Sequence, residues 1–126
     1  MSAKIVVTTA CAVGLLVVLV EGADLFTIWN LSPVAGVLAI TLAAQRRPLP
    51  TVVGPGALAL SSFVVLGLIA IAHLAWYFDW GRTATGSSTS ALLFVFIPIW
   101  AFAAGGVAMV VIVLGRALLA RSERGA

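Results

Sequence analysis

Four long apolar stretches, each free of Asp, Glu, Lys and Arg, constrain the fold of this chain more than any other feature. They cover residues 5–20, 25–44, 57–78 and 91–115. A helix needs about 20 consecutive apolar residues to cross the hydrocarbon core of a bilayer. Transmembrane β-strands instead alternate polar and apolar residues, whereas residues 110–114 read Val-Val-Ile-Val-Leu and are apolar on every side. The sequence therefore predicts an all-α integral membrane protein.

The polar segments between these stretches predict where the helices end. Residues 21–24 separate the first two stretches, and a connector at 45–56 is too rich in Pro and Gly to sustain a helix. Residues 79–90 are rich in Ser and Thr, which suit turns and helix starts. We expect one domain, residues 1–126, in which four transmembrane helices form a small bundle. Their expected spans are about 5–23, 25–45, 57–78 and 91–115.

Composition argues against most other classes of protein. Hydrophobic residues make up 63% of the 126 residues and charged residues 9%, where an average soluble domain carries about 25% charged residues. This disfavours a soluble globule, a disordered chain and a nucleic-acid-binding domain.

Cys11 and His73 are the only residues of their types, so we expect no disulfide chemistry, no haem held by two histidines and no zinc site. Ser87 and Ser88 lie in a loop with nothing to fix a nucleophile. We therefore expect no enzyme, no cofactor and no metal.

The positive charges predict an orientation, because Lys and Arg in short loops are retained on the cytoplasmic side. With both termini inside, six of the seven cations face the cytoplasm and only Arg82 faces outward. The six are Lys4, Arg46, Arg47, Arg116, Arg121 and Arg124. We expect a multi-pass protein of a bacterial inner membrane, with its N and C termini in the cytoplasm.

The first two helices each have an alternative interpretation. A cation precedes the first stretch and small residues flank Glu21, a pattern that also fits a secretory signal. Because Glu21 is atypical beside a cleavage site, we expect this helix to be retained. Ser32 and Pro33 resemble a helix start, but a helix beginning there is too short to cross a bilayer. We favour a helix from about Leu25 that is bent at Pro33, with a short interfacial segment at 25–31 as the alternative.

Small residues recur at helical spacing in three of the stretches, and they predict how the helices associate. In lipid, helices associate through close approach at small residues and through hydrogen bonds between helices. The stripes are Ala10 with Gly14, then Ala35, Ala39 and Ala43 beside Gly36, then Ala101 with Gly105, and Ala104 with Ala108. We expect them to pack helices within one bundle or between copies. A gating hinge at Pro98 and at Gly105 with Gly106 is the alternative.

A polar layer near the outer ends of the helices is the candidate site, since polar groups inside a membrane are costly. His73 lies five residues before Phe78, roughly 8 Å below the boundary at 1.5 Å per residue. The layer comprises Asn30, Ser32 and His73, with Asp79 and Arg82 on the rim beside Glu21 and Asp24. His73 either bonds neighbouring helices together or has a proton-linked or ligand-binding role. The aromatic residues around this layer form an interfacial belt, or else the walls of an outward-opening pocket floored by His73 and Asn30.

These features predict a small, non-catalytic membrane protein rather than a particular activity. We expect an accessory or interaction subunit of a membrane complex, or an immunity-type protector. Its expected partners are the lipid bilayer and other membrane protein subunits or copies of itself, and not nucleic acid. The alternative is a minimal oligomeric transporter or channel with an outward-facing polar layer around His73 and Asn30. A continuous water-filled cavity along the polar side chains favours transport, whereas side chains tied to neighbouring backbone favour the accessory role.

Overall fold

A computed structural model describes residues 3–46, 53–87 and 89–125 of the chain. The elements are α1 (Ala3–Glu21), α2 (Leu25–Arg46), α3 (Gly54–Tyr77), the short 3-10 turns η1 (Trp80–Arg82) and η2 (Ser90–Leu92), and α4 (Leu93–Gly125). All four α-helices are long and apolar enough to cross a membrane. The predicted all-helical fold with four such helices is therefore confirmed. Residues 47–52 of the predicted connector at 45–56, including Arg47, lie outside the described residues, as do Ser88 and the side chain of Arg124.

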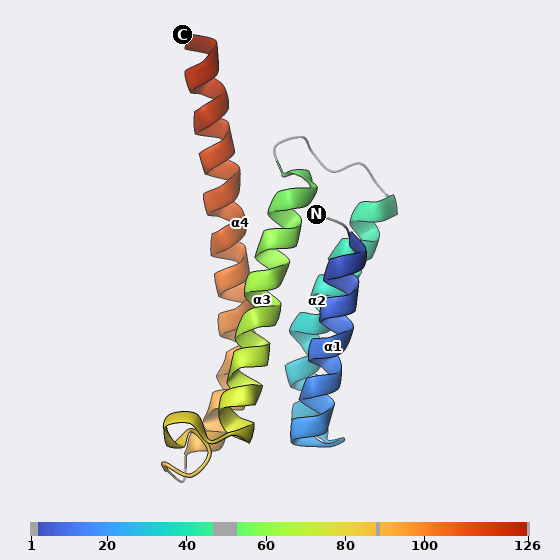
Figure 1. Cartoon of the computed structure of the whole chain (residues 1–126), viewed down its shortest axis with the longest axis vertical. Coiled ribbons are helices and arrows are strands. Elements are labelled where there is room, and N and C mark those ends of the chain that lie inside the picture. The colour runs from blue at the N-terminus through green and yellow to red at the C-terminus, as the bar shows by residue number, and fades with distance from the viewer. Residues whose placement is uncertain (1–2, 47–52, 88, 126) are drawn as a thin grey trace.

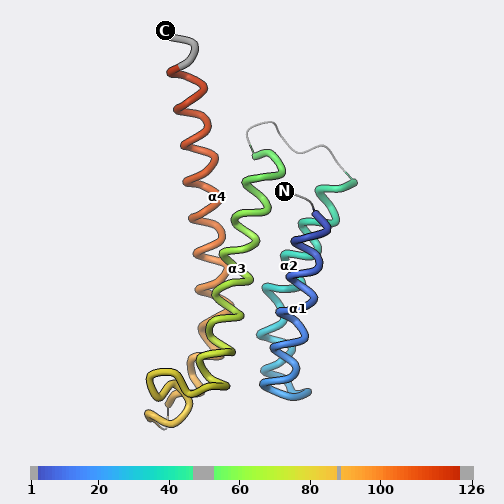
Figure 2. Tube along the Cα trace, viewed as in Figure 1, coloured from blue at the N-terminus to red at the C-terminus, as the bar shows by residue number. Residues whose placement is uncertain are grey.

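The helices form two antiparallel hairpins, α1–α2 and α3–α4 (Figure 1). The turns that close both hairpins lie at one end of the molecule, which we call the loop end, and the N and C termini lie toward the other, the terminal end (Figure 2). α2 and α3 each pack against all the other helices, whereas α1 and α4 do not pack against each other in the described ranges. The interior is therefore built around α2 and α3.

Local hydrogen bonds fix the turn between α1 and α2. Gly22 ends α1 with a φ of +83°, a conformation that favours glycine, and its N–H donates to the Val18 carbonyl at 2.9 Å. Asp24 then caps α2, because its Oδ1 accepts the backbone N–H of Thr27 at 2.9 Å. α2 begins directly after this cap, at Leu25, and Pro33 lies inside the helix. The tight turn places Glu21 at the loop end, facing the interior.

α4 continues ten residues past the predicted end at 115, to Gly125. Residues 116–124 consist mainly of Ala, Leu, Arg and Glu, which favour helix, and contain neither Pro nor Gly. The Arg116 Nη1 donates to the carbonyl of Val53 at 3.0 Å, just before α3 begins. The C-terminal part of α4 projects past the other helices, as Figure 1 shows.

The core is apolar and uses some of the predicted small residues. α1 buries one stripe at spacings of four, three and four, formed by Val6, Ala10, Val13 and Val17. Ala10 and Ala101 are completely buried, and Gly105 lies directly against Val65 of α3. By contrast, Ala35, Ala39 and Ala43 are all exposed on α2. One of the predicted stripes is therefore left uncovered by this chain.

Candidate functional site

The most unusual contact in the protein is a buried pair formed by His73 of α3 and Glu21 of α1. His73 is completely buried, and only 8% of the Glu21 side chain is exposed. His73 Nε2 lies 2.8 Å from Glu21 Oε1, and His73 Nδ1 lies 2.7 Å from the carbonyl oxygen of Ile69. A carbonyl oxygen only accepts hydrogen bonds, so Nδ1 carries a hydrogen and donates it to Ile69.

A hydrogen bond between His73 and Glu21 requires a shared proton. With the hydrogen of Nδ1 committed to Ile69, the contact between Nε2 and Oε1 is a hydrogen bond only if one further proton lies between them. That proton belongs either to an imidazolium facing a carboxylate or to a carboxylic acid facing a neutral imidazole. The pair of Glu21 and His73 is neutral overall in both cases, which a buried site favours because an uncompensated charge there is costly.

The second oxygen of the Glu21 carboxyl group has no hydrogen-bond partner among the described residues. Oε2 is buried, and Asn30 Oδ1 and Thr41 Oγ1 are likewise buried without a partner in these ranges. Most buried polar atoms in proteins are hydrogen-bonded, so each exception needs an explanation. Glu21 Oε2 is therefore a buried acceptor to which no described residue donates.

An open cavity of about 250 Å³ lies beside this carboxyl group at the loop end. It is lined by Val20, Glu21, Asp24, Phe26, Trp76, Ala91 and Phe94. Phe94 joins the cavity to the buried pair, because its ring centroid lies 5.0 Å from that of His73 and 4.9 Å from that of Trp76. The cavity thus combines aromatic walls with two carboxyl groups, and none of its lining residues is a Lys or Arg.

Asp24, at the exposed edge of this cavity, remains charged over a wide pH range. The backbone N–H of Thr27 holds the pKa of Asp24 below its ordinary value of 3.8, and the Thr27 hydroxyl adds to this effect. The mouth of the cavity therefore carries negative charge at neutral pH.

The structure shows the surroundings of the five residues of the predicted polar layer. Asn30 is completely buried and its Nδ2 donates to the Phe26 carbonyl of its own helix at 3.2 Å. Ser32 is half-buried on α2. No hydrogen bond or ion pair joins His73 to Asn30, Asp79 or Arg82 within the described ranges, because its two ring nitrogens contact Ile69 and Glu21. None of Asn30, Ser32 and His73 lines the cavity at the loop end.

Asp79 organises the loop between α3 and α4. Its Oδ1 accepts the backbone N–H groups of Ala84 at 2.8 Å and Thr85 at 3.1 Å, and its Oδ2 accepts the Thr85 hydroxyl at 2.6 Å. The Thr85 hydroxyl contributes most to holding the pKa of Asp79 below its ordinary value of 3.8, and Arg82 adds a smaller electrostatic attraction. Asp79 and Arg82 therefore both belong to the loop between α3 and α4.

Sequence reasoning placed Glu21 on the rim and missed its pairing with His73. The two residues are separated by 52 positions. One signal was available: both lie within about a turn and a half of the loop-side ends of their helices. An acidic residue and a histidine that lie at similar distances from the same end of two helices are candidates for a direct contact.

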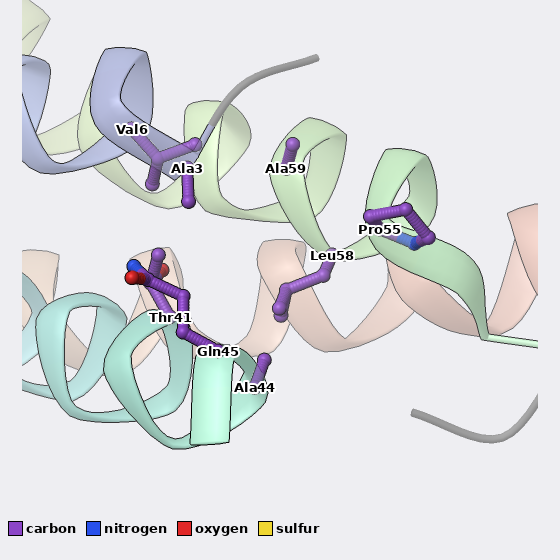
Figure 3. Close-up of a pocket in the computed structure, with 8 residues that line it drawn as sticks. All are labelled: Ala3, Val6, Thr41, Ala44, Gln45, Pro55, Leu58 and Ala59. Carbon is purple, nitrogen blue, oxygen red and sulfur yellow. The ribbon is translucent and has the colours of Figure 1, made fainter. Parts of the chain in front are cut away.

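A second cavity, of about 110 Å³, lies at the terminal end between α1, α2 and α3. Figure 3 shows its lining residues, which are Ala3, Val6, Thr41, Ala44, Gln45, Pro55, Leu58 and Ala59. Thr41 is one of these lining residues, and its hydroxyl is buried with no hydrogen-bond partner among the described residues. Between Asn30 and Thr41 the buried face of α2 is formed by Pro33, Val34 and Val37. Apolar side chains thus separate the buried polar groups of this helix.

No group of three or more His, Cys, Asp and Glu side chains that could hold a metal ion occurs in the part of the chain that the structure describes. Cys11 is exposed on α1. Comparison with protein-family models, with curated proteins and with solved structures finds no match to this chain.

Proposed function

We propose that this chain is a small, non-catalytic integral membrane protein that acts through helix contacts with another membrane protein. Such a protein is an accessory subunit of a membrane complex or an immunity-type protector. The observation that carries the proposal is the stripe of Ala35, Ala39 and Ala43, which repeats every four residues on α2 and which this chain leaves exposed.

The exposed stripe has buried counterparts in the same protein. In lipid, apolar side chains gain little by leaving hydrocarbon, so close backbone approach at small residues contributes much of the association between helices. The chain already uses Ala10, Ala101 and Gly105 in this way inside its own bundle. A shallow hollow also lies beside Ala39 and Ala43. A helix of a partner protein is the complement that such a surface fits.

The buried polar side chains also support an accessory role. His73 is bonded to Ile69 and Glu21, and Asn30 is bonded to Phe26. The alternative, a minimal oligomeric transporter or channel, is favoured by the unpartnered oxygens of Glu21, Asn30 and Thr41. The apolar face of α2 between Asn30 and Thr41 weighs against it, because an ion or polar solute crossing there meets no polar side chain of this helix.

The proposal includes an inner membrane of bacterial type, with both termini in the cytoplasm. Four apolar helices support the membrane location. The orientation is supported by the sequence positions of the cations, because six of the seven fall in segments on the same side as the chain ends when four spans are drawn.

Purification in mild detergent tests the proposed function. We expect the tagged protein to co-purify with a stoichiometric membrane protein partner. Ala39→Leu should lower the recovery of that partner by about tenfold or more, because it removes the close approach of the two helices. Ala12→Leu places the same bulk on the exposed surface of α1 and should leave recovery unchanged. Isolation only as a monomer contradicts the proposal, and isolation only as a homo-oligomer favours the transporter or channel instead.

A further inference from the structure

We propose that a cleft between α2, α3 and α4 holds one acyl chain of an anionic phospholipid, whose phosphate group accepts hydrogen bonds from Arg116. The inference shares the membrane location of the proposed function but concerns a different surface, because none of Ala35, Ala39 and Ala43 lines this cleft. It combines an apolar cleft, an arginine just beyond one end of it, and the positive charge of the terminal end.

The walls of the cleft suit an apolar occupant. Two serines line it, and the remaining lining residues are glycines or have apolar side chains. Ser61 and Ser62 both donate their hydroxyl hydrogens to the carbonyl of Leu58, at 3.1 and 2.8 Å. No side-chain donor in the described lining is therefore left for a polar ligand.

The size of the cleft selects a single hydrocarbon chain. On α4 the lining extends from Phe102 to Met109, which is about 10 Å at 1.5 Å per residue. A helix is about 10–12 Å across, so a length of 10 Å occupies on the order of 800–1,100 Å³. The cleft has a volume of about 260 Å³ and is too small for a helix. In a bilayer the surrounding lipid supplies chains that can fill such a space and regain its dispersion contacts.

Arg116 lies just beyond the end of the cleft that is nearer the terminal end. Its Nη1 donates to the Val53 carbonyl at 3.0 Å, and its guanidinium nitrogens lie beside Gly54 and Gly56 in the first turn of α3. Leu58, which lines the cleft, follows Gly54 by about one helical turn and so lies on the same face of α3. The guanidinium group is therefore roughly 3–6 Å beyond Leu58 along the helix.

Arg116 keeps the donors that a phosphate group needs. A guanidinium group has five N–H donors, and the bond to Val53 uses one of them. The side chain is exposed, so its other N–H groups can donate to phosphate oxygens, a geometry in which arginine often forms two parallel bonds. A phosphate placed there lies where the chain in the cleft reaches the membrane surface.

The charges at the terminal end favour a headgroup with a net negative charge. Arg46, Arg116 and Arg121 are all exposed at this end. The acidic side chains that the structure describes all lie at the loop end. Lys and Arg near a membrane surface attract anionic lipids, whereas the cation of a zwitterionic headgroup is repelled by the same arginines.

Three probes separate the contributions of charge and of the acyl chain. Native mass spectrometry of the purified chain in detergent measures the dissociation constant of the first bound molecule. The probes are anionic dioleoylphosphatidylglycerol, zwitterionic dioleoylphosphatidylcholine with the same chains, and glycerol phosphate, which has no acyl chain. We expect phosphatidylglycerol to bind at least about fivefold more tightly than phosphatidylcholine, and we expect no saturable binding of glycerol phosphate.

Two pairs of variants localise the binding. Arg116→Gln should weaken phosphatidylglycerol binding by about fivefold or more, whereas Arg121→Gln removes the same charge about a turn and a half farther along α4 and should leave binding unchanged. Gly106→Leu fills the cleft and should weaken the binding of both lipids by about fivefold or more. Gly67→Leu is its control, because a Cβ at Gly67 also meets no atom within 4 Å and Gly67 does not line the cleft.

The outcomes decide the proposal even if Gly106→Leu fails to fold, because Arg116→Gln and Arg121→Gln then provide the decisive comparison. Equal binding of the two lipids, equal weakening by the two arginine variants, or unchanged binding by a folded Gly106→Leu overturns it. Glycerol phosphate that binds as tightly as the lipid also overturns it, because phosphate alone is then sufficient. None of these results affects the co-purification experiment, which tests the face of α2 that carries Ala39.

Discussion

The contact between Glu21 and His73 makes each side chain depend on the other. Both are buried, and His73 Nε2 lies 2.8 Å from Glu21 Oε1. Removing one member leaves a buried polar group that has lost its partner, which destabilises a protein far more than an apolar replacement of both members.

We expect His73→Leu to lower the free energy of unfolding by about 3–5 kcal/mol at neutral pH, because Glu21 then remains buried without a partner. The double variant Glu21→Leu/His73→Leu should be more stable than His73→Leu alone, since neither polar group remains. Reversible unfolding in detergent, followed by circular dichroism, measures both values. A double variant that is no more stable than His73→Leu contradicts the coupling.

The sequence predicted the depth of His73 but not its partner. Depth follows from counting residues back from a helix end, because each residue adds 1.5 Å. The pairing depends on how α1 and α3 are rotated about their axes, and the apolar residues on all sides of these helices do not define that rotation. Asp79 was assigned to the rim, and its role in holding Ala84 and Thr85 required the three-dimensional course of the loop.

At the scale of the elements, α3 and α4 approach each other closely at Gly105. A Cβ added there would overlap Cγ2 of Val65, whereas a Cβ added at the adjacent Gly106 would meet no atom within 4 Å. Two neighbouring glycines of the same helix therefore differ completely in what they contact. Close packing at Gly105 also weighs against the gating hinge that the sequence left open there.

We expect Gly105→Ala to lower the free energy of unfolding by about 1–3 kcal/mol, because α3 and α4 must separate to accept the methyl group. Gly106→Ala is the matched control. It should be neutral or stabilising by up to about 1 kcal/mol, since alanine favours helix and nothing opposes its side chain. Thermal unfolding of the two variants in the same detergent distinguishes them, and equal melting temperatures would show that the approach at Gly105 is not tight.

The small-residue stripes show which part of the packing the sequence could predict. It predicted that small residues would lie at helix contacts, and Ala10, Ala101 and Gly105 are buried as that idea requires. It could not tell which stripe serves this bundle and which faces outward, because Ala35 and Ala39 have the same spacing as Ala101 and Gly105. The answer depends on the order of the helices in space.

At the scale of the whole molecule, the four helices and their antiparallel order bring both chain ends to one side (Figure 1). This part of the fold was predictable, since it follows from the number of apolar stretches and the shortness of the segments between them. Which helices contact one another was not predictable, because helices that are apolar on all sides do not specify their neighbours.

We expect a reporter enzyme that is active only outside the cytoplasm to be inactive when fused after Arg47 and active when fused after Ser88. The reason is the retention of Lys and Arg on the cytoplasmic side, which favours the terminal end facing inward. A reporter that is active only inside should give the opposite pattern. Activity of the first reporter at Arg47 contradicts the proposed orientation.

The length of α4 has a mechanical consequence. The helix is continuous from Pro98 to Gly125, and 27 residues at 1.5 Å each make a lever of about 40 Å. A change of about 10° in its direction at Pro98 would move its far end by about 7 Å. Arg116 holds α4 to the residue before α3, at Val53. Any tilt of α4 must therefore carry the start of α3 with it or break that bond.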